Sequence, residues 1–148
     1  MTDCEAVPGF DEAELYRTLF HFAGVGIGIT DIKNERIVRA NGKLCELLGY
    51  RQDEIAGMTF QAVTHPDDRE SSRNAVARLV RGDVPRISTQ KRYVRRDGST
   101  FYASLNATVV HDAQGAPTHT IAIVHDITSE KSAEQALQRS RERFRLIT

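Results

Sequence analysis

The stretch Pro117-Thr118-His119-Thr120-Ile121-Ala122-Ile123-Val124-His125 decides how the chain is interpreted. Apolar and β-branched residues dominate it, and no helix breaker interrupts it, so it predicts a strand. The strand ends at Asp126-Ile127-Thr128, and residues 129–137 are mostly strong helix formers without Gly or Pro. A strand that passes directly into a charged helix indicates a small folded body joined to a rod.

Composition restricts the classes of protein that need to be considered. The 148 residues suffice for one domain with an appendage, and Lys plus Arg equal Asp plus Glu at 20 each. A neutral chain lacks the excess positive charge of a nucleic-acid surface. No apolar run approaches the ~18 residues of a membrane span, and residues 1–5 do not resemble a secretory signal. We therefore expect a cytoplasmic protein in which Cys4 and Cys45 are reduced thiols.

The first half of the chain predicts short helices around one hairpin. Residues 1–10 contain Pro and Gly and are expected to form a flexible tail. Asn41 is a favourable N-cap, and Gly49 closes the helix that it begins. The expected elements, in order, are a helix over 11–22, strands over 25–31 and 36–39, a helix over 42–48, a helical turn over 52–55 and a helix over 66–81.

From Pro85 onward the apolar pattern alternates instead of following a helical period. Strands are expected over 86–95 and 100–110, joined by Asp97-Gly98, which is the strongest hairpin signal in the sequence. Together with the last strand they predict an antiparallel sheet with helices packed on one face. The fold class is therefore α+β.

Several local motifs occur in an order that resembles the PAS fold over residues 15–131. The resemblance implies a five-stranded antiparallel sheet with short helices on one face, an N-terminal cap helix and a C-terminal coiled-coil helix. It divides the chain into a PAS domain over 11–128 and a signalling helix over 129–148. The motifs are Ile37-Val38-Arg39-Ala40-Asn41, Cys45-Glu46-Leu47-Leu48-Gly49-Tyr50, Asp53-Glu54-Ile55-Ala56-Gly57, His65-Pro66-Asp67-Asp68-Arg69, Arg95-Arg96-Asp97-Gly98-Ser99 and Asp126-Ile127-Thr128-Ser129-Glu130-Lys131.

A second similarity lies within the chain itself. The segment Glu142-Arg143-Phe144-Arg145-Leu146-Ile147 resembles Glu14-Leu15-Tyr16-Arg17-Thr18-Leu19, which opens the first domain. It predicts that the signalling helix runs into a second PAS repeat, although so short a match also arises by chance.

The resemblance implies a sensory or regulatory module of a multidomain bacterial signalling protein. The output would be a histidine kinase or a GGDEF or EAL domain in the same polypeptide, beyond Thr148. The segment itself presents no catalytic motif, and helix-dipole interactions explain the carboxylates of Asp67, Asp68 and Glu70. A ligand-free dimerisation module is the alternative, and a haem-binding gas or redox sensor is a minor one.

An interior pocket is the candidate site for a small organic ligand, and the alternative is a filled core that holds none. The glycines of 24–28 are interpreted as close packing, because a phosphate-binding loop would follow a strand and begin a helix. The residues expected to line the pocket are Ile29, Leu48, Phe60, Leu79, Tyr93, Leu105 and Val124.

No cofactor or metal is predicted. The light-sensing branch of the family carries a reactive Cys on the helix before the long one, and residues 59–64 contain none. Haem-binding relatives take an axial His from the long helix, and residues 67–81 contain none, while His65 belongs to a capping motif. The histidines do not predict a metal site: His119 and His125 lie roughly 20 Å apart on one strand, and His111 and His119, which could approach each other, have no Cys or third His beside them.

Two further sets of residues are predicted to carry signalling. Asp126 and Thr128 are expected to fix the joint between strand and helix through side-chain hydrogen bonds to nearby backbone or to a basic partner. Along the last helix, the residues at alternating steps of four and three are apolar except for Ser140. This pattern predicts a parallel coiled coil and hence a homodimer, while a single amphipathic linker helix is the alternative. That seam is Ala133, Leu137, Ser140, Phe144 and Ile147. The expected dimer-interface residues are Leu15, Leu19, Ile121, Ile123, Leu137 and Phe144.

Overall fold

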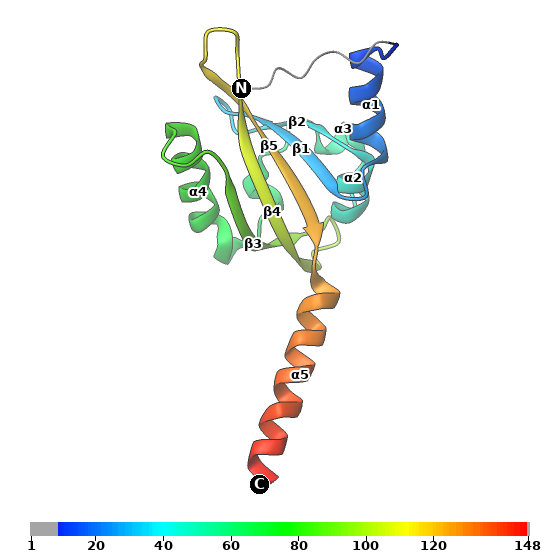
Figure 1. Cartoon of the computed structure of the whole chain (residues 1–148), viewed down its shortest axis with the longest axis vertical. Coiled ribbons are helices and arrows are strands. Elements are labelled where there is room, and N and C mark those ends of the chain that lie inside the picture. Colours follow the sequence, from blue (N-terminus) through cyan, green and yellow to red (C-terminus); the bar gives the residue numbers. More distant parts are fainter. Residues whose placement is uncertain (1–8, 148) are drawn as a thin grey trace.

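The fold is a single antiparallel sheet with helices on one face and a long helix projecting from one end (Figure 1). The computed structural model describes residues 9–147, so Cys4 and most of the expected N-terminal tail lie outside the described residues. The strands are β1 (Gly26–Asp31), β2 (Ile37–Ala40), β3 (Ile87–Val94), β4 (Thr100–His111) and β5 (Pro117–Asp126). The helices are α1 (Glu12–Phe22), α2 (Gly42–Leu48), α3 (Gln52–Ile55), α4 (Arg69–Arg81) and α5 (Thr128–Ile147), with 3₁₀ turns η1 (Phe60–Val63) and η2 (Pro66–Asp68).

The last strand occupies the centre of the sheet, whose order is β2-β1-β5-β4-β3. β5 therefore pairs along its length with β1 on one side and with β4 on the other. The expected α+β fold is confirmed, as is the hairpin at Asp97-Gly98, where Gly98 has φ +87°. The element that leads into α5 is thus the one most firmly held by backbone hydrogen bonds.

Asn41 anchors α2 against three other segments. Its Oδ1 accepts hydrogen bonds from the backbone N–H groups of Ile27 and Leu44, at 2.8 and 3.0 Å. Its Nδ2 donates to the carbonyl oxygens of Phe20 and Val25, at 2.9 and 3.0 Å. The side chain is fully buried, so the predicted N-cap also joins the end of α1 to the start of β1.

The glycines of β1 permit close packing of α2 on the sheet. A Cβ atom at Gly26 or at Gly28 would lie 3.0 Å from a methyl carbon of Leu44. In the register of the sheet these glycines pair with Val124 and Ala122, which face the helices. The predicted explanation by close packing therefore fits this strand, and only glycine brings α2 this near.

The same register corrects the expected orientation of Ile29. Ile27 pairs with Ile123 and Ile29 pairs with Ile121, so both lie on the outer face, away from the helices. The prediction that Ile29 lines the interior was wrong, because it gave the core face to the larger side chains of β1. The interior contribution of β1 comes from Gly26, Gly28 and Thr30.

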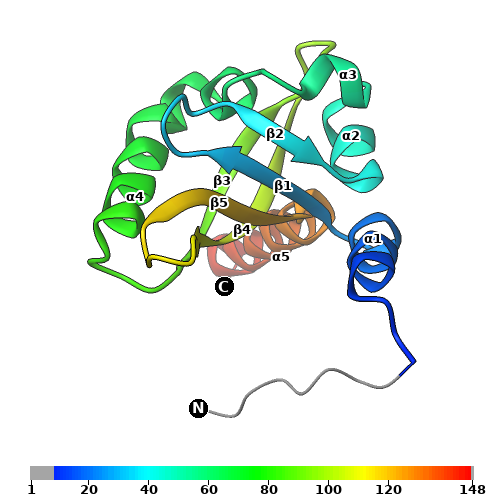
Figure 2. The same cartoon turned by 90° about the horizontal axis from the view of Figure 1, so that it is seen from above.

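α1 covers only the β2 edge of the outer face. Phe20 is buried and stacks with Tyr16, with ring centroids 5.6 Å apart, and the Arg39 guanidinium lies over both rings. Seen from above, α1 lies beside the start of β1 and does not cross the sheet (Figure 2). The apolar residues left exposed on α1 and on the rest of this face include Leu15, Leu19, Phe22, Tyr102, Val110 and Ile123.

Candidate functional site: the interior, a buried lysine and the joint to the last helix

The joint between β5 and α5 is held by side chains at both of its predicted positions. The Oδ1 atom of Asp126 accepts a hydrogen bond from the Thr128 backbone N–H at 2.9 Å. The Thr128 hydroxyl oxygen accepts one from the Tyr102 N–H at 3.2 Å, and the Ile127 N–H donates to the Tyr102 carbonyl. The first turn of α5 is therefore tied to β4 as well as to β5.

Arg95 connects this joint to the interior of the domain. Its Nη2 lies 3.9 Å from Asp126 Oδ2, and its Nε donates to the Leu47 carbonyl near the end of α2. The guanidinium also lies over the Phe101 ring, 4.6 Å from the centroid. Arg95 thus contacts α2 and a core aromatic ring, and its guanidinium forms a long ion pair with Asp126 at the joint.

The interior holds a small cavity and a larger cleft beside it. The cavity, of about 40 Å³, lies between the sheet and α2 and includes four of the residues predicted to line a pocket, namely Leu48, Phe60, Tyr93 and Val124. The cleft, of about 190 Å³, lies between α4 and the end of β1 and shares Thr30 and Phe60 with the cavity. The cavity has room for about one water molecule. Of these two, the cleft is the one that approaches the volume of a site for a drug-sized ligand.

The remaining predicted pocket residues lie elsewhere. Ile29 is on the outer face of the sheet, as described above. Leu79 is buried on α4 but does not line the cavity. Leu105 lines a separate pocket of about 60 Å³ between α4 and β3. The seven residues thus do not form one surface, because α4 packs over a different part of the sheet from α2.

Sequence reasoning missed the residue that gives this interior its chemistry. Lys91 of β3 is on the inner face of the sheet and only 8% exposed. Its Nζ donates to the hydroxyl oxygens of Thr64 and Ser72, each at 3.1 Å. The same nitrogen lies 4.7 Å from the ring centroid of Tyr93 and 5.6 Å from that of Phe60. The available signal was the alternation of β3, which places Lys91 on the same side as Tyr93.

The charge of Lys91 has little compensation nearby. Burial lowers its pKa to about 8, and the charge of Asp68 opposes that shift. The Asp68 carboxylate, however, accepts hydrogen bonds from the backbone N–H, Nε and Nη2 of Arg92, at 2.8 to 3.1 Å. Those bonds hold the pKa of Asp68 below its usual value. The charge of the Asp68 carboxylate is thus already balanced by that of Arg92, and among the described residues Asp68 forms no ion pair with Lys91.

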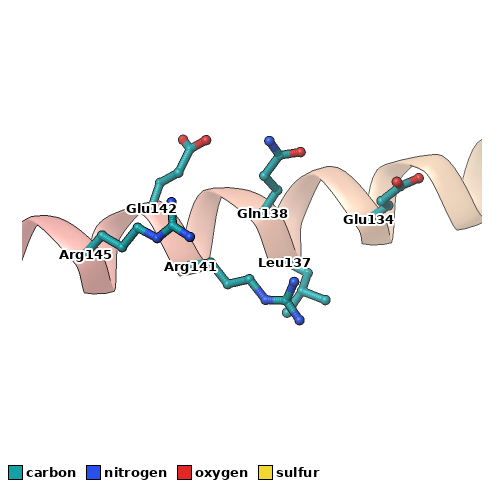
Figure 3. A pocket seen from close by; sticks show the side chains of 6 residues that line it. All are labelled: Glu134, Leu137, Gln138, Arg141, Glu142 and Arg145. Carbon is teal, nitrogen blue, oxygen red and sulfur yellow. The ribbon is translucent and has the colours of Figure 1, made fainter.

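The helix α5 presents a shallow groove instead of a cavity. Glu134, Gln138 and Glu142 project on one side of it, and Leu137 and Arg141 on the other (Figure 3). One solvent-exposed helix forms the whole groove, so it does not enclose a ligand. Leu137 is 54% exposed and Phe144 69% exposed, and the side chain of Ile147 lies outside the described residues.

The family model for the PAS fold matches residues 37–124 of this chain. Over 131 residues the chain is 32% identical to the probable diguanylate cyclase DgcE of Escherichia coli (strain K12). The aligned part covers 88% of this chain and 12% of DgcE. Over 122 residues it is 26% identical to the sensor histidine kinase TmoS of Ectopseudomonas mendocina, covering 82% of this chain and 12% of TmoS. The chain belongs to the PAS family, and it spans about an eighth of the length of these relatives.

A LOV protein of Rhodobacter sphaeroides has the same fold, with a TM-score of 0.68 and 20% identity, covering 86% of this chain and 74% of that chain. Another light-oxygen-voltage (LOV) domain of this fold is known with a flavin analogue, so a flavin is the cofactor to compare with the interior. The core cavity of about 40 Å³ is far smaller than a three-ring isoalloxazine, and the Tyr93 ring, which borders it, is held in place by stacking on Phe101. The residues present do not fit that cofactor.

Within residues 9–147 no cluster of three or more His, Cys, Asp or Glu side chains has the arrangement of a metal site. His65 caps η2, because its Nδ1 accepts a hydrogen bond from the Asp67 N–H at 3.1 Å. No helix in the described part of the chain is both long enough and apolar enough to span a bilayer.

Proposed function

We propose that this chain is the sensory or regulatory PAS module of a multidomain signalling protein, which passes a signal through β5 to α5. The output would be a diguanylate cyclase of the GGDEF type or a histidine kinase, as the names of DgcE and TmoS suggest. The cytoplasmic location, the domain limits of 11–128 and 129–148, and a second PAS repeat after α5 belong to the same proposal.

The observation that carries the proposal is an unbroken set of contacts from the core cavity to the start of α5. Val124 lines the core cavity, and two residues later Asp126 caps the backbone N–H of Thr128, where α5 begins. Arg95 adds a path from α2 and Phe101 to the same carboxylate. A shift of β5 at Val124, or of α2 beside Arg95, would therefore be passed to the Asp126 carboxylate, which holds the first turn of α5.

A second copy of the chain is the partner that we propose for the exposed apolar residues. Leu137 and Phe144 recur on α5 at a spacing that pairs two helices of the same kind. Leu15 and Leu19 of α1 and the outer-face residue Ile123 are also exposed, while Ile121 is half-buried beside them. A parallel dimer would cover these residues and hold the two rods in register.

The relay is tested with Asp126→Ala, and Asp83→Ala serves as the control on an exposed turn. We expect Asp126→Ala to retain the sheet and to increase amide hydrogen exchange several-fold in the first turn of α5, because a cap contributes about 1 kcal/mol. In the native multidomain protein, the same change should uncouple output activity from its stimulus. A normal response in that variant would refute the relay.

A ligand-free dimerisation module is the competing function, and the small size of the core cavity favours it. Native mass spectrometry of the purified chain distinguishes the two. A retained small molecule supports a sensor, and a dimer of bare chain mass supports the interaction module.

A further inference from the structure

Lys91 and Ser72 line a pocket that is separate from the core cavity. This pocket has a volume of about 60 Å³ and lies between α4 and β3, with Ser71, Thr89 and Gln90 among its other polar residues. Its volume is enough for about two water molecules or for one small polar group of a ligand. The ligand-sized cleft shares no lining residue with it.

The charge balance around Lys91 is incomplete. An ammonium has three N–H donors, and two of these are directed to the neutral hydroxyl oxygens of Thr64 and Ser72. Within residues 9–147 no carboxylate forms an ion pair with it, and Asp68 is occupied by Arg92. A buried charge without a counter-ion is costly, so the site favours an anion that supplies one.

The hydroxyls around Lys91 also favour an acceptor. The Thr64 hydroxyl donates its own proton to the Phe60 carbonyl at 2.8 Å, so its oxygen serves Lys91 as an acceptor. The Ser72 hydroxyl accepts from Lys91, and its proton has no acceptor among the described residues. An ammonium N–H and a hydroxyl proton side by side match the two oxygens of a carboxylate.

We propose that Lys91 and Ser72 form a binding site for the carboxylate of a small organic acid in the pocket between α4 and β3. One positive charge and a volume of about 60 Å³ suit a small monoanion. A phosphate dianion would need more charge and more donors, and Arg92 is already engaged by Asp68. Binding of a carboxylate at Lys91 and Ser72 does not depend on the signalling function proposed above. The consequence, that this anion is the input of the module, rests on the function proposed above.

Titration of Lys91 gives the site a pH dependence. The groups that face it are Asp68, which stays ionised beside Arg92, and Tyr93, whose pKa burial raises, so that it stays neutral. Thr64, which follows η1, and Ser72 of α4 do not titrate. Carboxylate affinity should therefore be constant below about pH 8 and fall above it, as Lys91 loses its proton.

The test uses sodium propionate on the purified chain, with propionamide as the neutral isostere and sodium chloride at equal ionic strength. We expect propionate alone to raise the melting temperature and to shift the Lys91 Nζ resonance in a ¹⁵N-lysine-labelled sample. Lys91→Met should lower propionate affinity about tenfold or more, and Ser72→Ala several-fold. Lys33→Met, at an exposed lysine, should bind like the wild type.

Equal effects of propionamide and propionate would overturn the proposal, as would no effect of propionate on the wild type. Should Lys91→Met fail to fold, the Ser72→Ala affinity and the wild-type Nζ shift decide the question in the same way. Failure of this test leaves the Asp126 relay intact, because that relay is measured without propionate. Binding of propionate without any change in hydrogen exchange of α5 would refute the anion as input.

Discussion

The two faces of the sheet differ in how they are covered, although the same strands form both. On the inner face of β5, Val124 is 2% exposed, and the adjacent Ile123 on the outer face is 42% exposed. The inner face is closed by short helices and includes a buried lysine and two glycines. The outer face has exposed apolar side chains among polar ones and is covered only at the β2 edge by α1. The inner face is completed within one chain, whereas the outer face leaves apolar side chains exposed, for which we propose a second copy of the chain as the cover.

The largest effect should come from removing the anchor of the inner face. Asn41→Ala leaves two buried carbonyl oxygens and two backbone N–H groups without their side-chain partner. We expect the free energy of unfolding in urea to fall by about 4 kcal/mol. Asn106→Ala, at an exposed outer-face position, should change it by less than about 0.5 kcal/mol. Similar losses at both positions would remove the contrast between the faces.

The next effect concerns the buried charge of Lys91. Its pKa is about 8 in the folded chain against 10.5 for a free lysine, so the unfolded chain binds more protons between these values. Stability should therefore rise with pH across that window by roughly 3 kcal/mol relative to Lys91→Met, and the two should run parallel below pH 8. Urea unfolding of both proteins from pH 7 to pH 10.5 measures the difference. Parallel curves throughout would mean that Lys91 is solvated.

The smallest effect compares neighbours on β5. Val124→Ala should cost about 2 kcal/mol in unfolding, whereas Ile123→Ala should cost less than about 1 kcal/mol in the monomer. Ile123→Ala should instead weaken self-association, measured by light scattering at increasing concentration. If it destabilises the monomer as much as Val124→Ala and leaves association unchanged, the outer face is not an interface.

The sequence predicted the features that depend on local chemistry. The cap at Asn41, the left-handed Gly49 and the hairpin at Asp97-Gly98 appear as expected, because each follows from the backbone preferences of a few adjacent residues. The hydrogen bond from the Thr128 N–H to Asp126 is equally local, whereas the bond from the Tyr102 N–H to the Thr128 hydroxyl joins residues 26 positions apart. Their role in relaying a signal remains a proposal.

The site could be predicted only in part, for two reasons. Alternation divides a strand into two faces but does not say which face meets the helices, so Ile29 was assigned to the interior in place of Gly28. The sequence did not predict Lys91 as an interior residue, because lysine is rarely buried. Its burial depends on Thr64 and Ser72, which lie 27 and 19 residues away in the chain.

The sequence by itself determined the elements, their order, the family and the passage of β5 into α5, because these follow from short-range propensity and from motifs in a fixed order. The tertiary structure alone decided which face of β1 is inward, how small the core cavity is and how Lys91 loses its solvent. Each of these depends on how closely α2 and α4 approach the sheet. That distance is set by packing between segments far apart in the chain.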